Sequence, residues 1–361
     1  MDMMYVEDCC EILDSMRVPI TASEREEGEY PYYGANGIQD HVADYIFDDE
    51  LVLLAEDGGN FGSKERPIAY RVSGKCWVNN HAHVLKPKDG LDVDYLCYSL
   101  MFYKVDGIVN GATRQKLTQA AMRKLQIPSR SMDEQKQIVD ELNRIIKIKE
   151  QRQQELALLD DLIKARFVEM FGDPRSNPFG FEKKMLKDTC KVITGNTPSR
   201  AIAEYYGDYI EWIKTDNIVS GILNPTQATE SLSEKGMNVG RTVEKDSILM
   251  ACIAGSIASI GRVCITDRTV AFNQQINAVV PEQYNILFLY VLLQMSKDYL
   301  VEDINMALKG ILSKSKLEEK EFIIPPMDLQ EQFSDFVHQV DKSKVVVMNG
   351  GENRCLRKTM L

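Results

Sequence analysis

The sequence predicts an α/β (α+β) fold, in which two similar mixed α/β domains are joined by a long helix that packs antiparallel against a C-terminal helix. Three observations favour this architecture. The stretch Met132–Met170 has helical apolar spacing and contains neither Gly nor Pro. The segments before and after it have similar strand, loop and helix patterns in the same order. A second, shorter helical pattern follows the second segment.

Length and composition indicate the class of protein. At 361 residues the chain can hold two domains with full cores, and its 44% hydrophobic and 27% charged residues are typical of soluble globular proteins. No apolar run approaches the roughly 18 residues of a membrane span, and the acidic N-terminus does not resemble a signal peptide. The eight cysteines lack zinc-ligand spacing. We therefore expect a cytoplasmic protein with reduced thiols and no membrane contact.

The first domain is expected to span residues 1–130. Hydrophobic patterning and turn residues predict its elements. In order, these are an amphipathic segment at Val6–Asp14, strands at Leu51–Leu54, Ile68–Val72 and Lys75–Val78, a helix at Val93–Lys104 and a strand at Leu125–Pro128. We place a turn at Ser73-Gly74, between the second and third of these strands.

The long helix is expected over residues 131–172. Its apolar residues recur in steps of three and four, which is the seam of a coiled coil. The seam residues are Ile138, Leu142, Ile145, Leu156, Leu159 and Ile163. At about 1.5 Å per residue, the stretch Met132–Met170 makes a rod roughly 58 Å long. A helix with one apolar stripe cannot bury itself, so it needs a partner helix; the alternative is a long core helix in an ordinary domain.

The second domain is expected over residues 173–327, where the plan of the first is repeated and the helix that matches Val93–Lys104 is expected over Asn285–Leu300. The join to the next helix gives the clearest match, because Ile127–Gln135 and Ile324–Gln332 share Ile, Pro, Glu and Gln at a constant offset of 197. The second helix is expected over residues 328–345. Its expected packing residues are Phe333, Phe336, Val337 and Val340. A β-prone stretch and two glycines then predict an irregular tail at residues 346–361.

The charge distribution favours a nucleic-acid partner despite a net charge of −11. Residues 1–57 hold sixteen acids and two bases, whereas residues 58–130 hold five acids and twelve bases. A basic region inside an acidic chain can bind phosphates, which the overall charge would oppose. The alternative is a chance imbalance between solvated faces.

No set of residues in the sequence has the pattern of a catalytic site. The small, polar loop Gly255–Gly261 lacks the lysine of a phosphate-binding loop. Asp57-Gly58-Gly59 is expected to be a turn rather than a carboxylate site. His81 and His83 alternate on a strand, so we expect a hydrogen-bonding pair on one binding face. Because no third ligand is evident, we expect no metal, and we predict that the chain binds rather than catalyses.

Polar and basic side chains in the matched loops are the candidate contacts to base edges and phosphates of double-stranded DNA. In the first domain they are Lys64, Arg66, Asn79, Asn80, His81, Arg114, Gln115 and Lys116. In the second domain they are Thr197, Ser199, Arg200, Lys214, Thr215, Asn217, Gln274, Gln275, Lys309 and Lys314. For each residue alone, a solvated surface side chain is the alternative; the recurrence of the loops in both domains favours binding.

Together these features resemble the specificity subunit of type I restriction–modification systems. In the second half the resemblance rests on Thr194–Ser199, Glu211–Ile218, Gly255–Arg262 and Phe272–Asn277. In the first half it rests on Tyr32–Ile38, Asp57–Gly59 and Asn79–His83. The joins at Ile127–Pro128 and Phe171–Pro174 are equally typical, and the resemblance covers residues 1 to about 345.

The resemblance implies two target-recognition domains, each reading one half of a split DNA target, and two spacer helices that also dock partner subunits. The implied partners are two modification (methyltransferase) subunits and restriction subunits. Those partners would supply the chemistry with S-adenosylmethionine, ATP and Mg2+, so this chain would be a non-catalytic subunit that binds no cofactor or metal itself. The unlike loops of the two domains imply an asymmetric target.

The second spacer helix is shorter than the resemblance implies. Part of the seam within Met132–Met170 would then lack its intramolecular partner, and we expect exposed apolar residues that favour self-association. One alternative function is a truncated regulator or decoy that binds DNA or modification subunits without supporting restriction. Another is a recognition module cut from a fused methyltransferase, which the absence of methyltransferase motifs disfavours.

Overall fold

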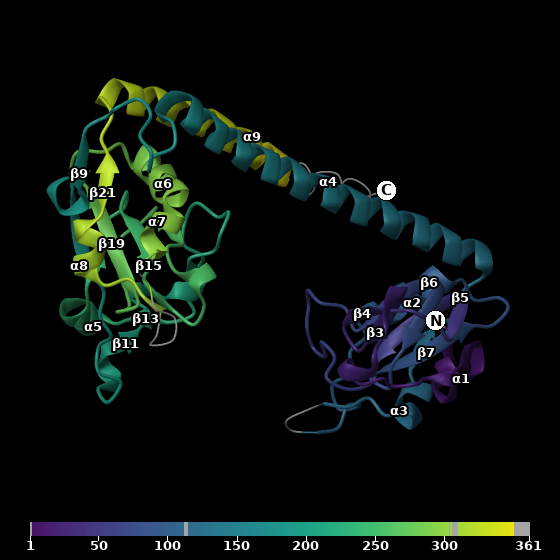
Figure 1. Ribbon diagram of the computed structural model, residues 1–361. Coiled ribbons are helices and arrows are strands. Elements are labelled where there is room, and N and C mark those ends of the chain that lie inside the picture. Colours follow the sequence, from purple (N-terminus) through teal and green to yellow (C-terminus); the bar gives the residue numbers. More distant parts are fainter. Residues whose placement is uncertain (1, 112–114, 303, 305–309, 350–361) are drawn as a thin grey trace, which may run out of the picture. The chain divides into compact units, whose positions relative to one another are not determined.

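Figure 1 shows the structure, a computed structural model that describes residues 2–111, 115–302, 304 and 310–349. The chain divides into two compact units, Met1–Glu150 (unit 1) and Gln151–Leu361 (unit 2). The division lies within the long helix, so each unit contains one mixed α/β domain and part of that helix.

Unit 1 is built on a six-stranded sheet with the strand order β2-β7-β5-β6-β3-β4. These strands are β2 (Cys10–Ile12), β3 (Glu27–Gly34), β4 (Gly37–Val42), β5 (Phe47–Ala55), β6 (Ala69–Val78) and β7 (Ala82–Pro87). A separate antiparallel pair is formed by β1 (Met3–Tyr5) and β8 (Gln126–Pro128). The helices before the long helix are α1 (Val6–Cys9), α2 (Val93–Met101) and α3 (Gln119–Arg123), with 3-10 turns at Asp14–Met16 and Ala22–Glu24.

One core of unit 1 packs α2 against the sheet. The predicted strand Leu51–Leu54 is confirmed as the central part of β5, and all four of its side chains are fully buried. Leu96 and Leu100 extend from α2 into this core. Asp92 caps α2, because its side chain accepts hydrogen bonds from two backbone N–H groups of the first turn.

The predicted turn at Ser73-Gly74 is wrong, because β6 is one continuous strand of 10 residues. Both residues pair with β5, through Glu50↔Ser73 and Asp49↔Gly74. Gly74 has a φ of 76° within the strand, a conformation that glycine adopts at little steric cost. A long antiparallel partner therefore outweighs the local preference for a turn.

Unit 2 holds a four-stranded sheet, β10-β19-β15-β17, and a five-stranded sheet, β11-β13-β12-β18-β14. The four strands are β10 (Cys190–Thr194), β19 (Ile276–Pro281), β15 (Ile248–Ala251) and β17 (Val263–Ile265). The five are β11 (Tyr206–Gly207), β13 (Ser231–Leu232), β12 (Ile210–Ile213), β18 (Val270–Phe272) and β14 (Thr242–Val243). Two further pairs join β16 (Ile253–Ala254) to β20 (Gly310–Ile311) and β9 (Lys183–Met185) to β21 (Glu321–Ile323).

The domain of unit 2 also contains short helices, two of which replace one predicted helix. They are α5 (Glu234–Val239), α6 (Ile286–Met295), α7 (Lys297–Val301) and α8 (Lys314–Glu319). Short 3-10 turns lie at Leu186–Asp188, Ala203–Tyr205, Thr215–Asn217 and Ile257–Ser259. The single helix predicted over Asn285–Leu300 is therefore two helices, α6 and α7, which meet at Ser296.

Helix α4 (Met132–Phe171) is 40 residues long, as the seam predicted. It begins with a capping box, in which the Ser131 N–H donates to Glu134 at 2.9 Å and the Glu134 N–H donates to the Ser131 hydroxyl at 3.4 Å. It ends at Gly172, whose φ of 72° is typical of a glycine that terminates a helix.

Helix α9 (Met327–Asn349) extends four residues beyond the predicted end at 345. Lys344 forms an ion pair of 2.7 Å with Asp160 of α4, and Arg152 of α4 donates to the carbonyl of Val347. Figure 1 shows α9 alongside α4. The contacts between the two helices outweigh the β preference of the valines. Residues 350–361 of the predicted tail lie outside the described part of the chain.

An aromatic cluster joins α4 and α9 to the domain of unit 2. Phe167 and Phe171 of α4 pack on Phe288 of α6 and Phe333 of α9, with ring centroids 4.8–5.6 Å apart for the four pairs between them. All four side chains are fully buried. Phe167 meets Phe333 near the start of α9, whereas Asp160 meets Lys344 near its end, so the helices are antiparallel as predicted.

The seam predicted from apolar spacing divides between the two units. The residues that pack into the core of unit 2 as predicted are Leu159, Ile163, Phe333, Phe336, Val337 and Val340. Ile138 packs instead on the core of unit 1, and Leu142 and Leu156 are half-buried. Ile145 is 55% exposed, so the prediction that it packs on a helix is not met in either unit. The spacing missed Phe167 and Phe171, which are the most buried hydrophobic residues of α4.

The internal repeat is present, but its register at the helix starts differs from the prediction. Gln135 and Gln330 are the matching buried residues, and each accepts a hydrogen bond from the N-cap residue of α2 or α6, at 2.8 Å and 2.9 Å. Their offset is 330 − 135 = 195, not 197. Met132-Asp133 and Met327-Asp328 match at the same offset of 195. Of the two Glu-Gln pairs that match at an offset of 197, the pair in the second copy is exposed.

The described cysteines behave as predicted. Seven of them are free and buried, and Cys355 lies outside the described residues. Among the helices of the described part, none has both the length and the apolar character to cross a membrane.

Candidate DNA interface

Both units form the same turn where two parallel strands end. Strands β3 and β6 are parallel in unit 1, as β12 and β18 are in unit 2. The residue after the second strand is a buried asparagine, Asn79 or Asn273, whose N–H donates to the neighbouring strand at 3.0 or 3.1 Å. Its Oδ1 accepts the N–H two residues later, from His81 at 2.8 Å and from Gln275 at 3.0 Å. Asn79, a predicted DNA contact, is therefore committed to a structural turn.

The middle residue of each turn faces solvent. Asn80 and Gln274, both predicted DNA contacts, are exposed at matching positions. Gln274 is joined to another candidate, because its Oε1 accepts a hydrogen bond from the Thr197 hydroxyl. Gln275 is half-buried, and its Oε1 accepts from the Asn273 amide at 3.1 Å. Each unit thus presents an uncharged amide side chain at the middle of the same turn, and the two side chains differ in length.

The two histidines of unit 1 do not form the predicted pair on one face. His81 lies in the turn before β7, with a 35% exposed side chain whose Nδ1 is 2.6 Å from Asp57. His83 is fully buried; its Nδ1 is 2.7 Å from Asp14 and its Nε2 is 2.8 Å from the carbonyl oxygen of Leu117. Strand alternation does not apply to His81, because β7 begins only at Ala82.

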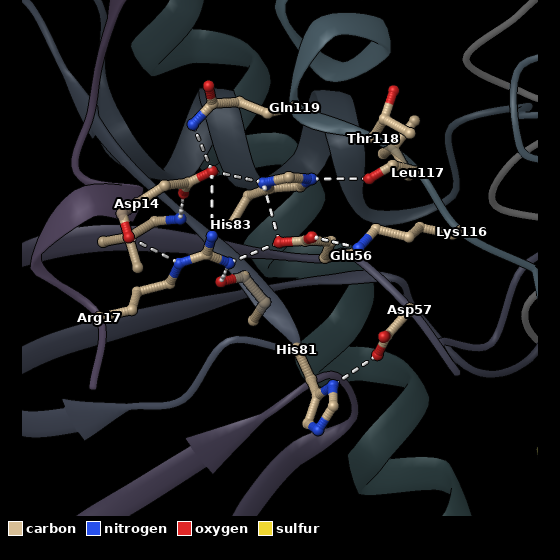
Figure 2. A network of polar contacts seen from close by, with 12 residues as sticks. Asp14, Arg17, Glu56, Asp57, His81, His83, Lys116, Leu117, Thr118 and Gln119 are labelled. Carbon is tan, nitrogen blue, oxygen red and sulfur yellow. Dashed lines mark hydrogen bonds and ion pairs between the residues drawn. The ribbon is translucent and has the colours of Figure 1, made fainter. Parts of the chain in front are cut away.

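Figure 2 shows a buried charged network around His83. The Arg17 guanidinium lies between two carboxylates, 2.6 Å from Glu56 and 3.5 Å from Asp14. Burial is the largest single influence on Asp14 and opposes its ionisation, but the hydrogen bond and electrostatic interaction with His83, together with hydrogen bonds from Val84 and Gln119, hold the pKa of this carboxyl below its usual value. Burial likewise opposes ionisation of Glu56, whose pKa is held low by Arg17 and Lys116.

The donor atoms of Asp14, Glu56 and His83 lie within 4.8 Å of one another, as in a metal site. Sequence spacing did not reveal this set, because the two carboxylates come from distant segments. Both nitrogens of His83 already have hydrogen-bond partners, and the two carboxylates are already paired with the two cations Arg17 and Lys116. We therefore interpret the set as a salt-bridge network and propose no metal there.

The network holds the segment from Lys116 to Gln119 in place. Lys116 forms an ion pair of 3.0 Å with Glu56, and the amide of Gln119 donates to Asp14 at 2.9 Å. The backbone N–H of Leu117 donates to the carbonyl oxygen of Glu56 at 2.7 Å. The candidates Gln115 and Lys116 are exposed beside this network, whereas Arg114 lies outside the described residues.

Unit 2 has uncharged residues at the same positions. The residues of unit 2 that correspond by strand register to Asp14, Glu56 and His83 are Thr194, Cys252 and Asn277. The Thr194 hydroxyl donates to Asn277 at 2.8 Å, and the Asn277 amide donates to the Cys252 sulfur at 3.3 Å. Burial raises the pKa of the Cys252 thiol to about 12, so this thiol is neutral.

Unit 2 carries a cluster in which the exposed Arg200 and the half-buried Lys214 lie over aromatic rings. Arg200 donates two hydrogen bonds to the carboxylate of Glu230, at 3.1 and 2.8 Å. Its guanidinium lies 4.6 Å from the ring centroid of Tyr206 and 5.4 Å from that of Trp212. Lys214 is 2.5 Å from the same carboxylate. Hydrogen bonds from both cations lower the pKa of Glu230 to about 2.

The remaining candidates occupy several environments. Asn217 is buried and caps a 3-10 turn, accepting from the Lys214 N–H at 3.0 Å and donating to Thr226 at 3.2 Å. Thr215 is half-buried. Exposed candidates are Lys64, Arg66, Ser199 and Lys314, the last 3.5 Å from Glu318. Lys309 lies outside the described residues. The side chains that the sequence missed are Arg17, Arg25, Glu56 and Glu230, whose neighbours are distant in sequence.

Comparison with known proteins gives one family. The family model described as type I restriction modification DNA specificity domain matches residues 1–158 and 178–354. A putative type I restriction enzyme specificity subunit of Haemophilus influenzae, S.HindORF215P, is 37% identical over 134 residues, which are 37% of this chain and 34% of the relative. The HindI specificity subunit of the same organism is 35% identical over 32% of this chain and 25% of its own length.

Longer matches extend the likeness along the chain. The MjaIX specificity subunit of Methanocaldococcus jannaschii is 25% identical over 75% of this chain and 68% of the relative. The solved S subunit of a type I system from M. genitalium has a TM-score of 0.57 at 14% identity, covering 99% of this chain and 94% of that one. A structure from a study of type I assembly and conformational transition has a TM-score of 0.54 at 13% identity, covering 99% and 95%. These two structures show a shared fold. The matches to the two Haemophilus proteins span about a third of their length or less.

Proposed function

Because this chain belongs to the type I restriction modification DNA specificity family, we propose that it recognises the DNA target of a type I restriction–modification enzyme. The observation that carries this proposal is the repeated turn at Asn79 and Asn273. One backbone frame occurs in both units and presents different exposed side chains, Asn80 and Gln274, at the same place. Amide side chains of this kind read base edges, so unlike amides on like frames suit a target with two unlike halves.

Charge near each turn supports contact with the DNA backbone. In unit 1, Lys116 and the exposed Lys64 and Arg66 belong to the basic stretch of residues 58–130. In unit 2, Arg200 and Lys214 share a single carboxylate, so that cluster keeps a positive charge. Such positive charge supplies the sequence-independent attraction to the DNA backbone, while the side chains that contact base edges supply discrimination.

We assign the chemistry of the enzyme to partner subunits. The proposed partners are two modification subunits and the restriction subunits, which would use S-adenosylmethionine, ATP and Mg2+ in the cytoplasm. Exposed apolar residues on α4 within unit 1, Ile145, Ile146 and Ile148, offer a surface for a modification subunit. The same residues would favour self-association of the isolated chain. Light scattering with and without modification subunits distinguishes these two states.

Exchange of one recognition segment tests the proposal. Residues 58–130 are replaced by the corresponding segment of a family member with a different target, and the methylated motif is read by sequencing DNA from cells that carry the whole system. We expect one half of the motif to change and the other half and the spacing to stay. A change in both halves, or an unaltered motif with normal methylation, would contradict the proposal.

A further inference from the structure

The two units place an aromatic residue and a carboxylate at equivalent positions of one antiparallel strand pair. In unit 1, Tyr32 of β3 lies directly opposite Asp40 of β4. In unit 2, Trp212 of β12 lies opposite Glu230, since the Trp212 N–H donates to the Glu230 carbonyl at 3.1 Å, one pair beyond the Glu211↔Ser231 pair. The residues that follow Tyr32 and Trp212 each pair with the last residue before the repeated turn. The positions are therefore equivalent in the two frames.

An arginine from the preceding loop covers each pair. Arg25 lies 4.2 Å from the ring centroid of Tyr32 and 3.1 Å from the Asp40 carboxylate. Arg200 lies over Trp212 and Tyr206 and holds Glu230 with two hydrogen bonds. A guanidinium stacked on a ring and held by a carboxylate has a fixed plane. The same three-part arrangement thus occurs twice in the chain.

The two arginines differ in what they leave accessible. The Arg25 side chain is 18% exposed, and its Nε donates to the carbonyl oxygen of Ile20 at 3.2 Å. Tyr32 beneath it is 1% exposed, so this arginine closes a packed loop. The Arg200 side chain is 56% exposed, and Lys214 lies beside it on the same carboxylate. The arginine of unit 2 is therefore the more accessible of the two.

We propose that Arg200, held by Glu230 and the Tyr206–Trp212 rings, reads the edge of a guanine in the half-site of unit 2. This inference rests on the proposed DNA-recognition function. Arginine has five N–H donors, of which two bind Glu230, so three remain for the O6 and N7 acceptors of guanine. Arg25 has the equivalent place in unit 1, but its side chain is only 18% exposed.

A base edge suits this cluster better than a phosphate. The Glu230 carboxylate is 34% exposed beside Arg200, so the cluster presents an acceptor next to its donors, and a phosphate, which has only acceptors at neutral pH, cannot use it. The same carboxylate can accept a hydrogen bond from the amino group of cytosine, which is the partner of guanine. The rings are themselves fixed, because Tyr206 donates to the Pro198 carbonyl at 2.7 Å and Trp212 donates to that of Asn196 at 3.3 Å. Orientation is therefore set before DNA arrives, which favours discrimination.

The test compares Arg200→Ala, Arg200→Lys and Arg25→Lys in cells that carry the whole system, with the methylated motif read by sequencing. We expect Arg200→Ala to relax one G·C position in one half-site, raising methylation of sites with another base there by about tenfold or more relative to the intact target. Arg200→Lys keeps the charge but loses the planar fork, so it should relax the same position. Arg25→Lys should leave both half-sites unchanged.

Each other outcome overturns the inference in a recognisable way. A uniform fall in methylation of all sites, with every motif position still sharp, would make Arg200 a phosphate contact. An unchanged motif and rate would remove it from the interface. Relaxation in both half-sites would mean that the cluster of Arg200, Glu230 and the two rings stabilises the whole fold. Thermal unfolding of the purified variants would reveal such a loss of stability. If the wild-type system gave no sequence-specific methylation at all, the proposed function itself would fail, independently of Arg200.

Discussion

Unit 1 and unit 2 have the same backbone frame around different buried polar groups. In unit 1 the positions behind the repeated turn hold Asp14, Glu56 and His83 with Arg17 between the carboxylates. In unit 2 the corresponding residues form a neutral chain of hydrogen bonds ending at a thiol. Strand register and an asparagine turn therefore define the shared frame. The charged network, which occurs in unit 1 alone at these positions, holds the segment that bears Lys116.

Removal of the central carboxylate should break this comparison most strongly. Glu56→Ala leaves Arg17, with a side chain only 12% exposed, without its closest partner, so we expect unit 1 to lose about 3 kcal/mol of unfolding free energy. The matched variant Cys252→Ala should cost unit 2 only about 1 kcal/mol.

The two tryptophans allow each unit to be followed separately. Trp77 lies in β6 of unit 1 and Trp212 in β12 of unit 2, and the sequence has no other tryptophan. Urea unfolding is measured by fluorescence in a Trp212→Phe background for unit 1 and in a Trp77→Phe background for unit 2. Equal losses from Glu56→Ala and Cys252→Ala would contradict the distinction between the units.

Acid should weaken unit 1 through its carboxylates. The pKa values of Asp14 and Glu56 are lower in the folded state than their usual values of 3.8 and 4.5. Their stabilisation is therefore present above those values and is lost as the pH falls through the lower folded pKa values. Urea midpoints of the Trp212→Phe protein between pH 7 and pH 3 should fall, and the combined change Asp14→Asn and Glu56→Gln should flatten that pH dependence. A pH dependence that survives in the double variant would point to other groups.

The shared turn should respond equally in both units. Asn79→Ala and Asn273→Ala each remove the acceptor for a backbone N–H two residues later, and each should cost about 1–2 kcal/mol. The single-tryptophan backgrounds assign each loss to its unit. A cost limited to one unit would show that the turn is structural in that unit alone.

The smallest expected effect concerns Lys116 and phosphate binding. If this exposed cation contacts DNA, Lys116→Ala should weaken binding and reduce the slope of log affinity against log salt by about 0.9. Lys86→Ala is the control, because that lysine, like Lys116, is paired with a carboxylate but is no candidate contact. Fluorescence anisotropy with duplex DNA at several salt concentrations measures both slopes for the complex with modification subunits. An unchanged slope would exclude Lys116 from the phosphate contacts.

The architecture was accessible from the sequence because it depends on long patterns. The seam of α4, the buried strand at Leu51–Leu54 and the order of elements in the two units all follow from periodicity. The turn at Ser73-Gly74 failed because a neighbouring strand supplied pairing that local preference does not contain. The part of α9 beyond residue 345 was missed because contacts with α4 outweigh β propensity.

The candidate site was less accessible, because a side chain's role depends on neighbours that are distant in sequence. Spacing suggested that His81 and His83 act together, whereas the fold gives His83 to Asp14, 69 residues away, and His81 to Asp57. Asn79 matched the chemistry of base readers, yet the turn uses its side chain. Arg200 was identified by residue type alone, and its rings and carboxylate became evident only in the structure.

The most direct measurement of the central claim is the methylated motif after exchange of residues 181–327 for those of a family member with another target. If the two units read DNA independently, this exchange changes one half of the bipartite motif. The changed half is the one that exchange of residues 58–130 leaves unaltered. The spacing between the halves should stay the same. A motif in which both halves change, or in which both exchanges alter the same half, would contradict the account.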